Sequence, residues 1–349
     1  MYKAFKYRLK PNKEQEQQLI SFVGASRWIW NHCLDLNKEH YEKNKQFIFK
    51  YDLKVKLPKL KQEHTWLSDV PSQALTNRII DFDTALKRVW KQGSGFPRYK
   101  SKHIEGHNTF RIDQTNKHIK PTKKQIKIPK LGWVTWKRHR PLEGKLCNIT
   151  IKQENNMWWC ICLCQIPDVT PLSEVTEDKV VGIDLGIKEF VITSDGEYFD
   201  TKHTYKNNQN KLEKLQRKLS KHKKGSNNRN KQRKKINKIH YKIKNQRIDY
   251  IHKISNQITK NYDFIIVEDL NISGMMKNRH LSKAIMEQGW GMFINQLCYK
   301  SMKNGGQTVK IGRFLPSSKT CSSCGNIQTM PLNVRTYECS NCGFIIDRD

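Results

Sequence analysis

Apolar residues in the first third of the chain follow two different periods. Residues 2–9 alternate as a strand does, and Pro11-Asn12-Lys13 then starts a helix, because proline near the first turn loses no helical hydrogen bond. Apolar side chains follow at helical spacing: Leu19, Phe22, Val23, Trp30 and Leu34. After a turn at 69–72, a second helix carries Ala74, Ile79, Phe82, Ala85 and Val89 on one face. The pattern predicts an α-helical unit over residues 13–92.

From residue 93 the pattern changes to short strands. Residues 93–102 form a glycine-rich, basic connector, and strands then follow at 125–128, 133–136, 147–152 and 157–165. With the N-terminal strand they predict a small antiparallel barrel made of residues 1–12 and 93–170. Cys160, Cys162 and Cys164 share one face of the last strand. Metal ligation is an alternative for them, but we expect core residues because this spacing fits tetrahedral zinc poorly.

An acidic break at residues 171–178 predicts a linker to a second domain, residues 179–349. Three strands come next, at 180–187, 189–193 and 197–200, which is how a ribonuclease-H-like fold opens. A helical hairpin is predicted over 204–260, with leucines on its first arm, isoleucines on its second and a break at 225–228. A further helix through Ile285, Trp290 and Leu297 precedes a strand at 307–315. The predicted fold class is therefore α/β plus all-β.

Two apolar strands of this second domain deliver acids. Asp184 lies in Val-Val-Gly-Ile-Asp-Leu-Gly, which reads as a strand buried on both faces, and Glu268 ends Phe-Ile-Ile-Val-Glu. If the strands are parallel neighbours, their carboxyl ends meet at one edge of the sheet and the two acids face each other across a metal ion. Asp269 is then a turn or capping residue. A plain loop aspartate and the strand-turn of sugar kinases or actin-like ATPases are the alternatives for Asp184.

The composition of the chain predicts a polyanionic binding partner. The formal net charge is +33, from 65 basic and 32 acidic residues, which opposes compaction unless a polyanion neutralises it. Nucleic acid is the natural counter-charge. The alternative of a basic membrane-surface protein is less favoured, because the basic residues are spread along the chain and not confined to one amphipathic helix. We expect a soluble, cytoplasmic protein, since the chain shows neither a signal peptide nor an apolar run long enough to span a membrane.

Several basic and polar stretches are candidate nucleic-acid contacts. Residues 221–247 contain no acid and have a lysine or arginine at about every second position, so we expect them to bind phosphate and not simply to form a solvated face. Gln73, Asn77 and Arg78 lie on the predicted polar side of their helix, where they either contact bases and phosphates or are merely solvated. The candidate contacts are Gln73, Asn77, Arg78, Arg98, Lys100, Lys102, Lys223, Lys224, Arg229, Arg233, Lys234 and Lys235.

Four cysteines near the C-terminus form the most specific single motif. Cys321 and Cys324 make one Cys-X-X-Cys pair, and Cys339 and Cys342 make another 14 residues later, each followed directly by glycine. Two such pairs close a tetrahedron of thiolates around one zinc ion. Because four thiolates leave no open position, the zinc is structural and catalysis lies elsewhere. The alternative of four unrelated thiols is not favoured.

The closing Asp347-Arg348-Asp349 brings a third acid to the same domain. Three carboxylates can bind two Mg²⁺ ions, one activating water and one steadying the leaving oxygen in phosphodiester hydrolysis. The acids therefore predict a nuclease centre.

These motifs together resemble a known family. Gly-Ile-Asp-Leu-Gly around Asp184, Ile-Ile-Val-Glu-Asp-Leu-Asn around Glu268, the two cysteine pairs and the closing Asp-Arg-Asp are similar in order and spacing to TnpB proteins of bacterial insertion sequences. Residues 3–12 and 96–102 fit as well, so the resemblance covers almost the whole chain. These proteins are relatives of compact type V CRISPR nucleases.

The resemblance implies a wedge barrel with an inserted helical recognition domain, then a RuvC-type nuclease domain carrying a zinc ribbon at 316–345. It implies a protein that is monomeric on a transposon-derived guide RNA and cuts target double-stranded DNA beside a short transposon-associated motif. Asp184, Glu268 and Asp349 become the magnesium ligands, with Asp349 preferred to Asp347. The family pattern continues with Asn-Ala-Ala after a further residue, whereas this sequence stops at Asp349.

Two other functions compete with an RNA-guided, Mg²⁺-dependent DNA endonuclease. The first is an RNA-guided DNA-binding protein with weak or no cleavage, because the buttress of Asp349 is missing from the sequence. The second is an actin-like ATPase, which needs additional glycine-rich phosphate loops that the sequence does not show.

Overall fold

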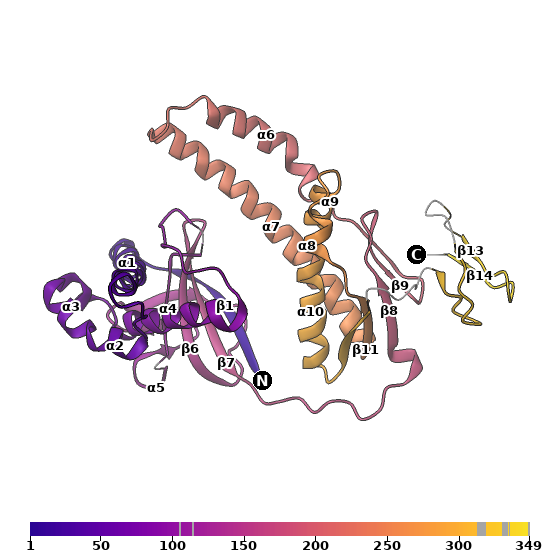
Figure 1. Ribbon diagram of the computed structural model, residues 1–349, viewed down its shortest axis with the longest axis horizontal. Helices are drawn as coiled ribbons and strands as arrows, with labels where there is room; N and C mark the ends of the chain where they lie inside the picture. Colours follow the sequence, from indigo (N-terminus) through magenta and orange to yellow (C-terminus); the bar gives the residue numbers. More distant parts are fainter. Residues whose placement is uncertain (105, 114, 313–318, 330–333, 335, 348–349) are drawn as a thin grey trace. The chain divides into compact units, whose positions relative to one another are not determined.

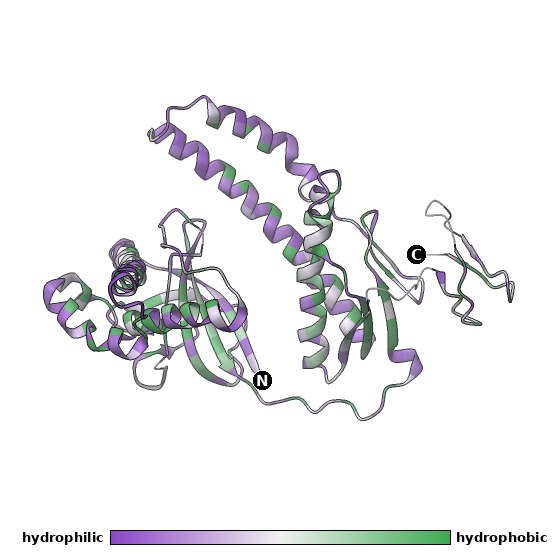
Figure 2. Ribbon diagram, viewed as in Figure 1, coloured by the Kyte–Doolittle hydropathy of each residue, from purple (hydrophilic) through white to green (hydrophobic). Residues whose placement is uncertain are grey.

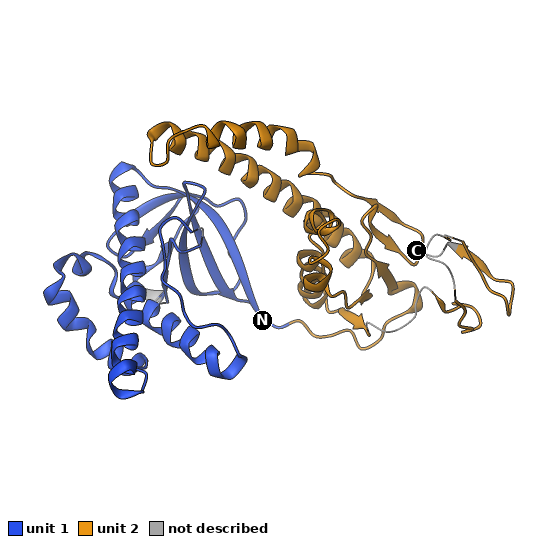
Figure 3. Ribbon diagram, turned by 45° about the horizontal axis from the view of Figure 1, so that its top comes forward, with its two compact units in different colours: residues 1–168 blue, residues 169–349 orange. Residues whose placement is uncertain are grey.

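The computed structural model describes residues 1–104, 106–113, 115–312, 319–329, 334 and 336–347. The chain divides into two compact units, residues 1–168 and 169–349 (Figure 3). The division falls just before the acidic segment 171–178. Among the described residues, no helix combines the length and the apolarity that a membrane span requires.

Unit 1 contains a seven-stranded antiparallel sheet in the order β2-β6-β7-β1-β5-β4-β3. The strands are β1 (Tyr2–Lys10), β2 (Thr109–Ile112), β3 (Lys120–Pro121), β4 (Gln125–Ile128), β5 (Gly132–Lys137), β6 (Lys145–Glu154) and β7 (Met157–Gln165). A short helix, α5 (Thr115–His118), follows β2. Alternate residues of each long strand are buried, including Cys160, Cys162 and Cys164, so the prediction that these cysteines belong to the core is confirmed.

A helical segment between β1 and β2 packs onto this sheet. It consists of α1 (Lys13–Asn44), α2 (Lys50–Val55), α3 (Leu57–Glu63), the 3-10 turn η1 (Thr65–Asp69) and α4 (Ser72–Gln92). Asn12 caps α1 by accepting from the Gln15 backbone N–H at 2.8 Å, and the Gln15 side chain bonds back to the Asn12 backbone. Phe22 of α1 meets Phe110 of β2 edge to face, with ring centroids 5.8 Å apart. Helices and sheet therefore share one hydrophobic core.

Unit 2 is built on a five-stranded mixed sheet. Its strands are β8 (Val180–Asp184), preceded by the turn η2 (Glu177–Lys179), β9 (Glu189–Thr193), β10 (Tyr198–Asp200), β11 (Phe264–Glu268) and β12 (Gln307–Ile311). The spatial order is β10-β9-β8-β11-β12. Strands β8, β9 and β10 run antiparallel in sequence, whereas β11 pairs in parallel with both β8 and β12. The sheet thus places the ends of β8 and β11 side by side.

The helices of unit 2 are α6 (Lys206–Ser220), α7 (Asn227–Asn261), α8 (Ile272–Met275), α9 (Ser282–Gln288) and α10 (Trp290–Lys303). The C-terminal half of α7 and α10 cover one face of the sheet. The N-terminal half of α7 extends away from the sheet as a hairpin with α6 (Figure 1), and most residues of this hairpin are hydrophilic (Figure 2). The single helix predicted through Ile285 and Leu297 is instead two, because Gly289 between them has φ +71° and packs closely against Ile251 and Arg247 of α7.

The final element is a small antiparallel ribbon of β13 (Thr336–Glu338) and β14 (Ile345–Asp347). Tyr337, Cys321 and Cys339 form its buried cluster. The four C-terminal cysteines lie in and around this ribbon.

Candidate metal centres and nucleic-acid contacts

The two cysteine pairs adopt the same turn. In each, the backbone N–H of the glycine after the second cysteine donates to the carbonyl of the first, at 2.9 Å for both Gly325 to Cys321 and Gly343 to Cys339. Both glycines have positive φ, +74° and +68°, which explains why glycine follows each pair. The repeated backbone geometry directs all four thiols to one point.

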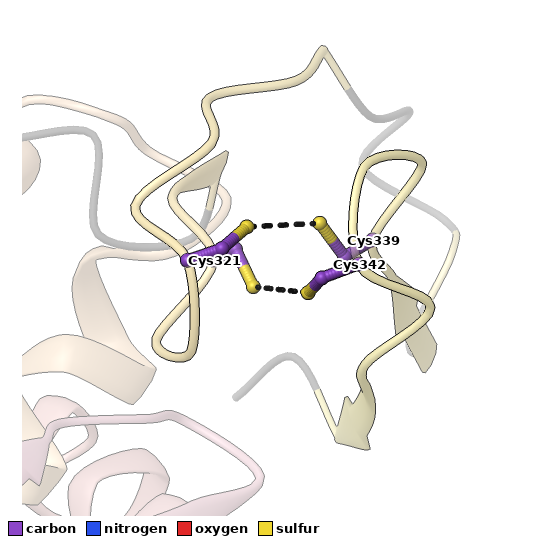
Figure 4. Close-up of side chains that lie close together, drawn as sticks. Cys321, Cys339 and Cys342 are labelled. Atoms are coloured by element: carbon purple, nitrogen blue, oxygen red, sulfur yellow. Dashed lines mark hydrogen bonds between the residues drawn. The ribbon is translucent and has the colours of Figure 1, made fainter.

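The four sulfur atoms have the geometry of a tetrahedral metal site. They lie within 4.8 Å of one another, with 3.6 Å between Cys321 Sγ and Cys342 Sγ and between Cys324 Sγ and Cys339 Sγ (Figure 4). Zinc–sulfur bonds of about 2.3 Å give a tetrahedron edge of about 3.8 Å, close to these separations. The thiols are not joined as disulfides. This is a zinc-binding four-cysteine motif, as the sequence predicts.

The surroundings of two of the four thiols, Cys324 and Cys339, favour the thiolate form that zinc binds, whereas burial and the neighbouring thiols raise the pKa of Cys342. Hydrogen bonding from the backbone N–H of Cys342 lowers the pKa of the Cys339 thiol to about 6. The side chain of Asn341 donates to Cys324 Sγ at 3.7 Å. Gln328 braces the second turn by accepting from the Ser340 backbone N–H at 3.0 Å. Such outer contacts orient metal ligands.

The two acids of the sheet lie where the sequence predicts. Strands β8 and β11 are parallel neighbours in register, with Val267 opposite Ile183, so Asp184 and Glu268 follow at adjacent strand ends. The prediction that their strands are neighbours and parallel is confirmed. Because side chains alternate along a strand, both acids project from the face opposite Ile183 and Val267.

The prediction that β8 is buried on both faces is wrong. Val181 and Ile183 pack under α7 and α10, whereas Val180, Gly182 and Asp184 on the other face are half-buried, and β11 alternates in the same way. Apolar residues on both faces hide this alternation from the sequence. Because Asp184 is only half-buried, the cost of burying its carboxylate does not by itself require a metal ion. The prediction that Asp184 is a metal ligand depends instead on the position of Glu268 at the neighbouring strand end.

Two further acids were considered for this site, Asp269 and Asp349. Asp269 directly follows β11 and carries an ion pair with Lys310, its Oδ1 lying 3.4 Å from Lys310 Nζ. Asp349, the predicted third ligand, lies outside the described residues. Two carboxylates on one face and at one edge supply the hard oxygen ligands that Mg²⁺ prefers, so the donor chemistry fits magnesium.

The prediction that Asn77 and Arg78 lie on a solvent-facing polar side of α4 is wrong. Both side chains are buried within unit 1. Asn77 Nδ2 donates to the Arg111 carbonyl at 3.0 Å. Arg78 donates to Ser26 Oγ at 2.8 Å and to the Thr109 carbonyl, which ties α4 to α1 and β2. Gln73 accepts from the Asp113 backbone N–H at 3.2 Å and is half-buried.

Two of the basic residues in the connector after α4 face solvent, and a third packs against the protein. Arg98 and Lys102 are exposed, and their backbone carbonyls accept hydrogen bonds from the side chains of Trp30 and Asn108. Lys100 instead turns inward, with its Nζ 4.0 Å from the centre of the Trp30 ring. Burial lowers the pKa of Lys100 to about 8.

The α6–α7 hairpin presents most of its predicted basic residues to solvent. Lys223, Lys224, Arg233, Lys234 and Lys235 are exposed. Arg229 differs, because its guanidinium donates to the carbonyls of Leu219 and His222 at 2.7 and 3.0 Å and so closes the turn between the helices. Arg229 therefore stabilises the hairpin.

Sequence reasoning missed a basic pocket in unit 1. A cavity of about 340 Å³ is lined by Lys123, Arg138, His139, Arg140 and Pro141. The Tyr7 hydroxyl donates to the Arg140 carbonyl at 3.1 Å and so fixes this segment to the sheet. The signal was the run Lys-Arg-His-Arg at 137–140.

Comparison with known proteins gives matches along the whole chain. Residues 162–279 match a family described as "Probable transposase", residues 1–46 a "Helix-turn-helix domain", and residues 290–349 a "Cas12f1-like, TNB domain". In this chain, residues 1–46 form β1 and the single helix α1.

Full-length relatives are similar as well. The "Putative RNA-guided DNA endonuclease InsQ" of Escherichia coli (strain K12) is 32% identical over 341 residues, covering 93% of this chain and 83% of that protein. A "Putative RNA-guided DNA endonuclease" of Streptomyces pristinaespiralis is 30% identical over 353 residues, covering 99% and 86%. A solved Cas12f1-sgRNA-target DNA complex contains a chain with a TM-score of 0.60 at 14% identity, covering 94% of this chain and 92% of that one. That likeness shows a shared mixed α/β fold.

Proposed function

Because the chain belongs to the TnpB family of insertion-sequence proteins, we propose that it is an RNA-guided DNA endonuclease. Its target is double-stranded DNA beside a short transposon-associated motif, and its guide is an RNA derived from the transposon. The observation that carries the proposal is the pairing of β8 with β11, which brings Asp184 and Glu268 to one edge and one face of the sheet. The names of the two full-length relatives support it.

The strand order of unit 2 supports a RuvC-type assignment of this domain. An antiparallel run of three strands, followed by two strands parallel to the first, is the arrangement of a ribonuclease-H-like fold. The four-cysteine ribbon then belongs to this nuclease domain. The antiparallel sheet of unit 1 takes the role of the wedge, and residues 13–92 take the role of the recognition domain.

Asp184 and Glu268, with Asp349 assigned by resemblance, would hold two Mg²⁺ ions. Bound there, the ions supply an activated water and charge stabilisation of the leaving oxygen. The protein holds the carboxylates of Asp184 and Glu268 in fixed positions. Their strands, β8 and β11, are hydrogen-bonded on both sides, and such strands fix their ends more firmly than loops do. Phe190 of β9 packs with Ile251 of α7 and Phe293 of α10 beneath the sheet, and this core keeps the sheet rigid.

The charge of the chain supports a nucleic-acid partner. A net charge of +33 is balanced when the protein, as one copy, holds its guide RNA. Exposed Arg233, Lys234 and Lys235 on the α6–α7 hairpin are the first candidates for contacts with RNA phosphates.

Substitution of the two acids tests this function. In protein purified with its RNA, Asp184→Asn or Glu268→Gln should lower target cleavage at least about 10²-fold, because each removes a ligand of ions that supply several kcal/mol. Binding of the target should stay unchanged, as measured by gel shift in Ca²⁺. Asp269→Asn is the matched control, since Asp269 pairs with Lys310, and it should cut normally. Asp349→Asn and Asp347→Asn, compared directly, test the choice of third ligand.

Absence of a discrete co-purified RNA, together with no cleavage of a matching target, would overturn the proposal. Target binding with no cleavage even by the parent protein would instead favour an RNA-guided binding protein.

A further inference from the structure

One surface of unit 1 gathers aromatic rings from three segments. We use the name aromatic platform for the side chains of Tyr41 at the end of α1, Phe47 after it, Trp90 at the end of α4, and Phe96 and Tyr99 in the connector. Phe47 lies at the centre, with its ring centroid 4.6 Å from that of Tyr41, 5.1 Å from Trp90 and 6.0 Å from Phe96. The rings of Tyr41, Phe47, Trp90 and Phe96 form a continuous group.

The outer rings of the platform are open to solvent. Trp90 is 54% exposed, Tyr99 46%, Tyr41 42% and Phe96 39%. A packed aromatic side chain buries 150–250 Å², so leaving several half-exposed in one place forgoes much hydrophobic stabilisation. Contiguous exposed apolar surface of this kind marks a binding site.

Cations surround the platform. Lys38 Nζ lies 4.3 Å from the Tyr99 ring centre and donates to its hydroxyl, and Lys45 Nζ lies 5.7 Å from the Tyr41 ring centre. The segments that build the surface, 35–56 and 87–99, contain ten lysines and arginines against four acids. Two copies of this surface would repel each other, whereas a polyanion that also offers flat rings is complementary to it.

We infer that the aromatic platform binds an unpaired DNA strand by base stacking. Stacking is tolerant of sequence, because every base has a π-face, and the lysines hold the backbone. The inference rests on the proposed function for the source of the strand, which is the non-target DNA strand displaced when the guide RNA pairs with the target strand. That strand differs with every target, so contacts that ignore sequence suit it.

Binding of oligothymidylate to the full-length protein tests the platform directly. Tyr41→Leu/Trp90→Leu keeps apolar side chains but removes two π-faces, and it should weaken binding about tenfold or more by fluorescence anisotropy at raised salt. The matched control is Tyr2→Leu/Trp133→Leu, which removes one tyrosine and one tryptophan of similar exposure, 64% and 42%, from the sheet of unit 1. The control should bind as the parent does. Tyr41→Phe/Trp90→Phe should restore most of the affinity.

A second arm uses the RNA-loaded protein and a matching target with or without the displaced strand. The platform variant should lose target affinity only when the displaced strand is present. Equal loss in the platform and control variants, or parental affinity in the platform variant, overturns the inference. The inference is also overturned if the platform variant binds oligothymidylate as the parent does but differs from the parent in sedimentation or in binding to anionic vesicles. A protein that binds oligothymidylate through the platform but carries no guide RNA and cuts no matching target would refute the proposed function and leave the stacking site standing.

Discussion

Lys300 of α10 carries an ammonium group into the core of unit 2. The residue is 8% exposed, and its Nζ donates to the His252 carbonyl at 2.9 Å and to Ser255 Oγ at 2.7 Å on α7. Ser255 Oγ in turn lies 2.9 Å from Gln296 Oε1. Burial lowers the pKa of Lys300 to about 8. The charge is satisfied by hydrogen bonds, but no carboxylate is among these partners.

We predict that this lysine costs stability at neutral pH. In the unfolded chain its pKa is about 10.4, so the penalty of burying the charge is complete below about pH 8 and is relieved as the pH rises from there towards 10.4. Lys300→Met should therefore stabilise unit 2 at pH 7 by about 1–4 kcal/mol, and its advantage over the parent should shrink in alkaline buffer. Thermal melts from pH 7 to 10 measure this. Lys303→Met, an exposed change in the same helix, should shift the melt little at any pH. A destabilised Lys300→Met would contradict the prediction.

Asn77 and Arg78 mark the limit of sequence reasoning at the scale of single residues. Helical spacing separates an apolar from a polar face, and it correctly put Ala74, Ile79 and Phe82 in the core. It cannot show that a polar side chain is buried when its partners lie far away in sequence, as Ser26 and Thr109 do for Arg78. The four thiols were predictable because each pair is local and its chemistry is specific.

At the scale of elements, strands and hairpins followed from periodicity. The bounds of β4 and β7, the α6–α7 hairpin and the parallel pairing of β8 with β11 match the predictions. The break at Gly289 did not, because a lone glycine within a helical pattern does not show whether its φ is positive. The single buried face of β8 was missed because it follows from where α7 and α10 pack.

The ribbon should depend on zinc for its fold. Its buried cluster among the described residues is Tyr337 with two of the cysteines, too small a core to fold without the metal. Cys339→Ser should lower bound zinc from about one ion per chain to near zero and expose residues 319–347 to proteolysis, while far-UV circular dichroism of the remainder persists. Cys147→Ser, outside the cluster, should keep its zinc. Full zinc in the Cys339→Ser protein would refute the assignment of the site.

At the scale of the whole molecule, the net charge of +33 and the projecting hairpin belong to one explanation. The hairpin's own core is small, consisting of Leu212, Ile236, Ile239 and Ile243, whereas Lys223, Lys224 and Arg233–Lys235 face outward. Like charges along a helix destabilise it unless counterions or phosphates lie against it. The hairpin is therefore the part of the chain whose charge most needs the RNA.

Salt dependence measures that contribution. Arg233→Gln/Lys234→Gln/Lys235→Gln should reduce the slope of log K for guide RNA against log salt by about 0.7–0.9 for each phosphate that is no longer neutralised, which is about 2.1–2.7 units for three phosphates. Lys260→Gln/Lys283→Gln/Lys303→Gln removes the same charge from exposed positions of unit 2 outside the part of the hairpin that extends away from the sheet, and it should change the slope much less. Affinity at one salt concentration cannot separate these cases. Any removal of positive charge weakens the long-range attraction, whereas fewer counterions are released only when a side chain that neutralised a phosphate is removed. Equal slopes for the two triple variants would mean that the hairpin attracts the RNA through its long-range electric field alone and neutralises no phosphate directly.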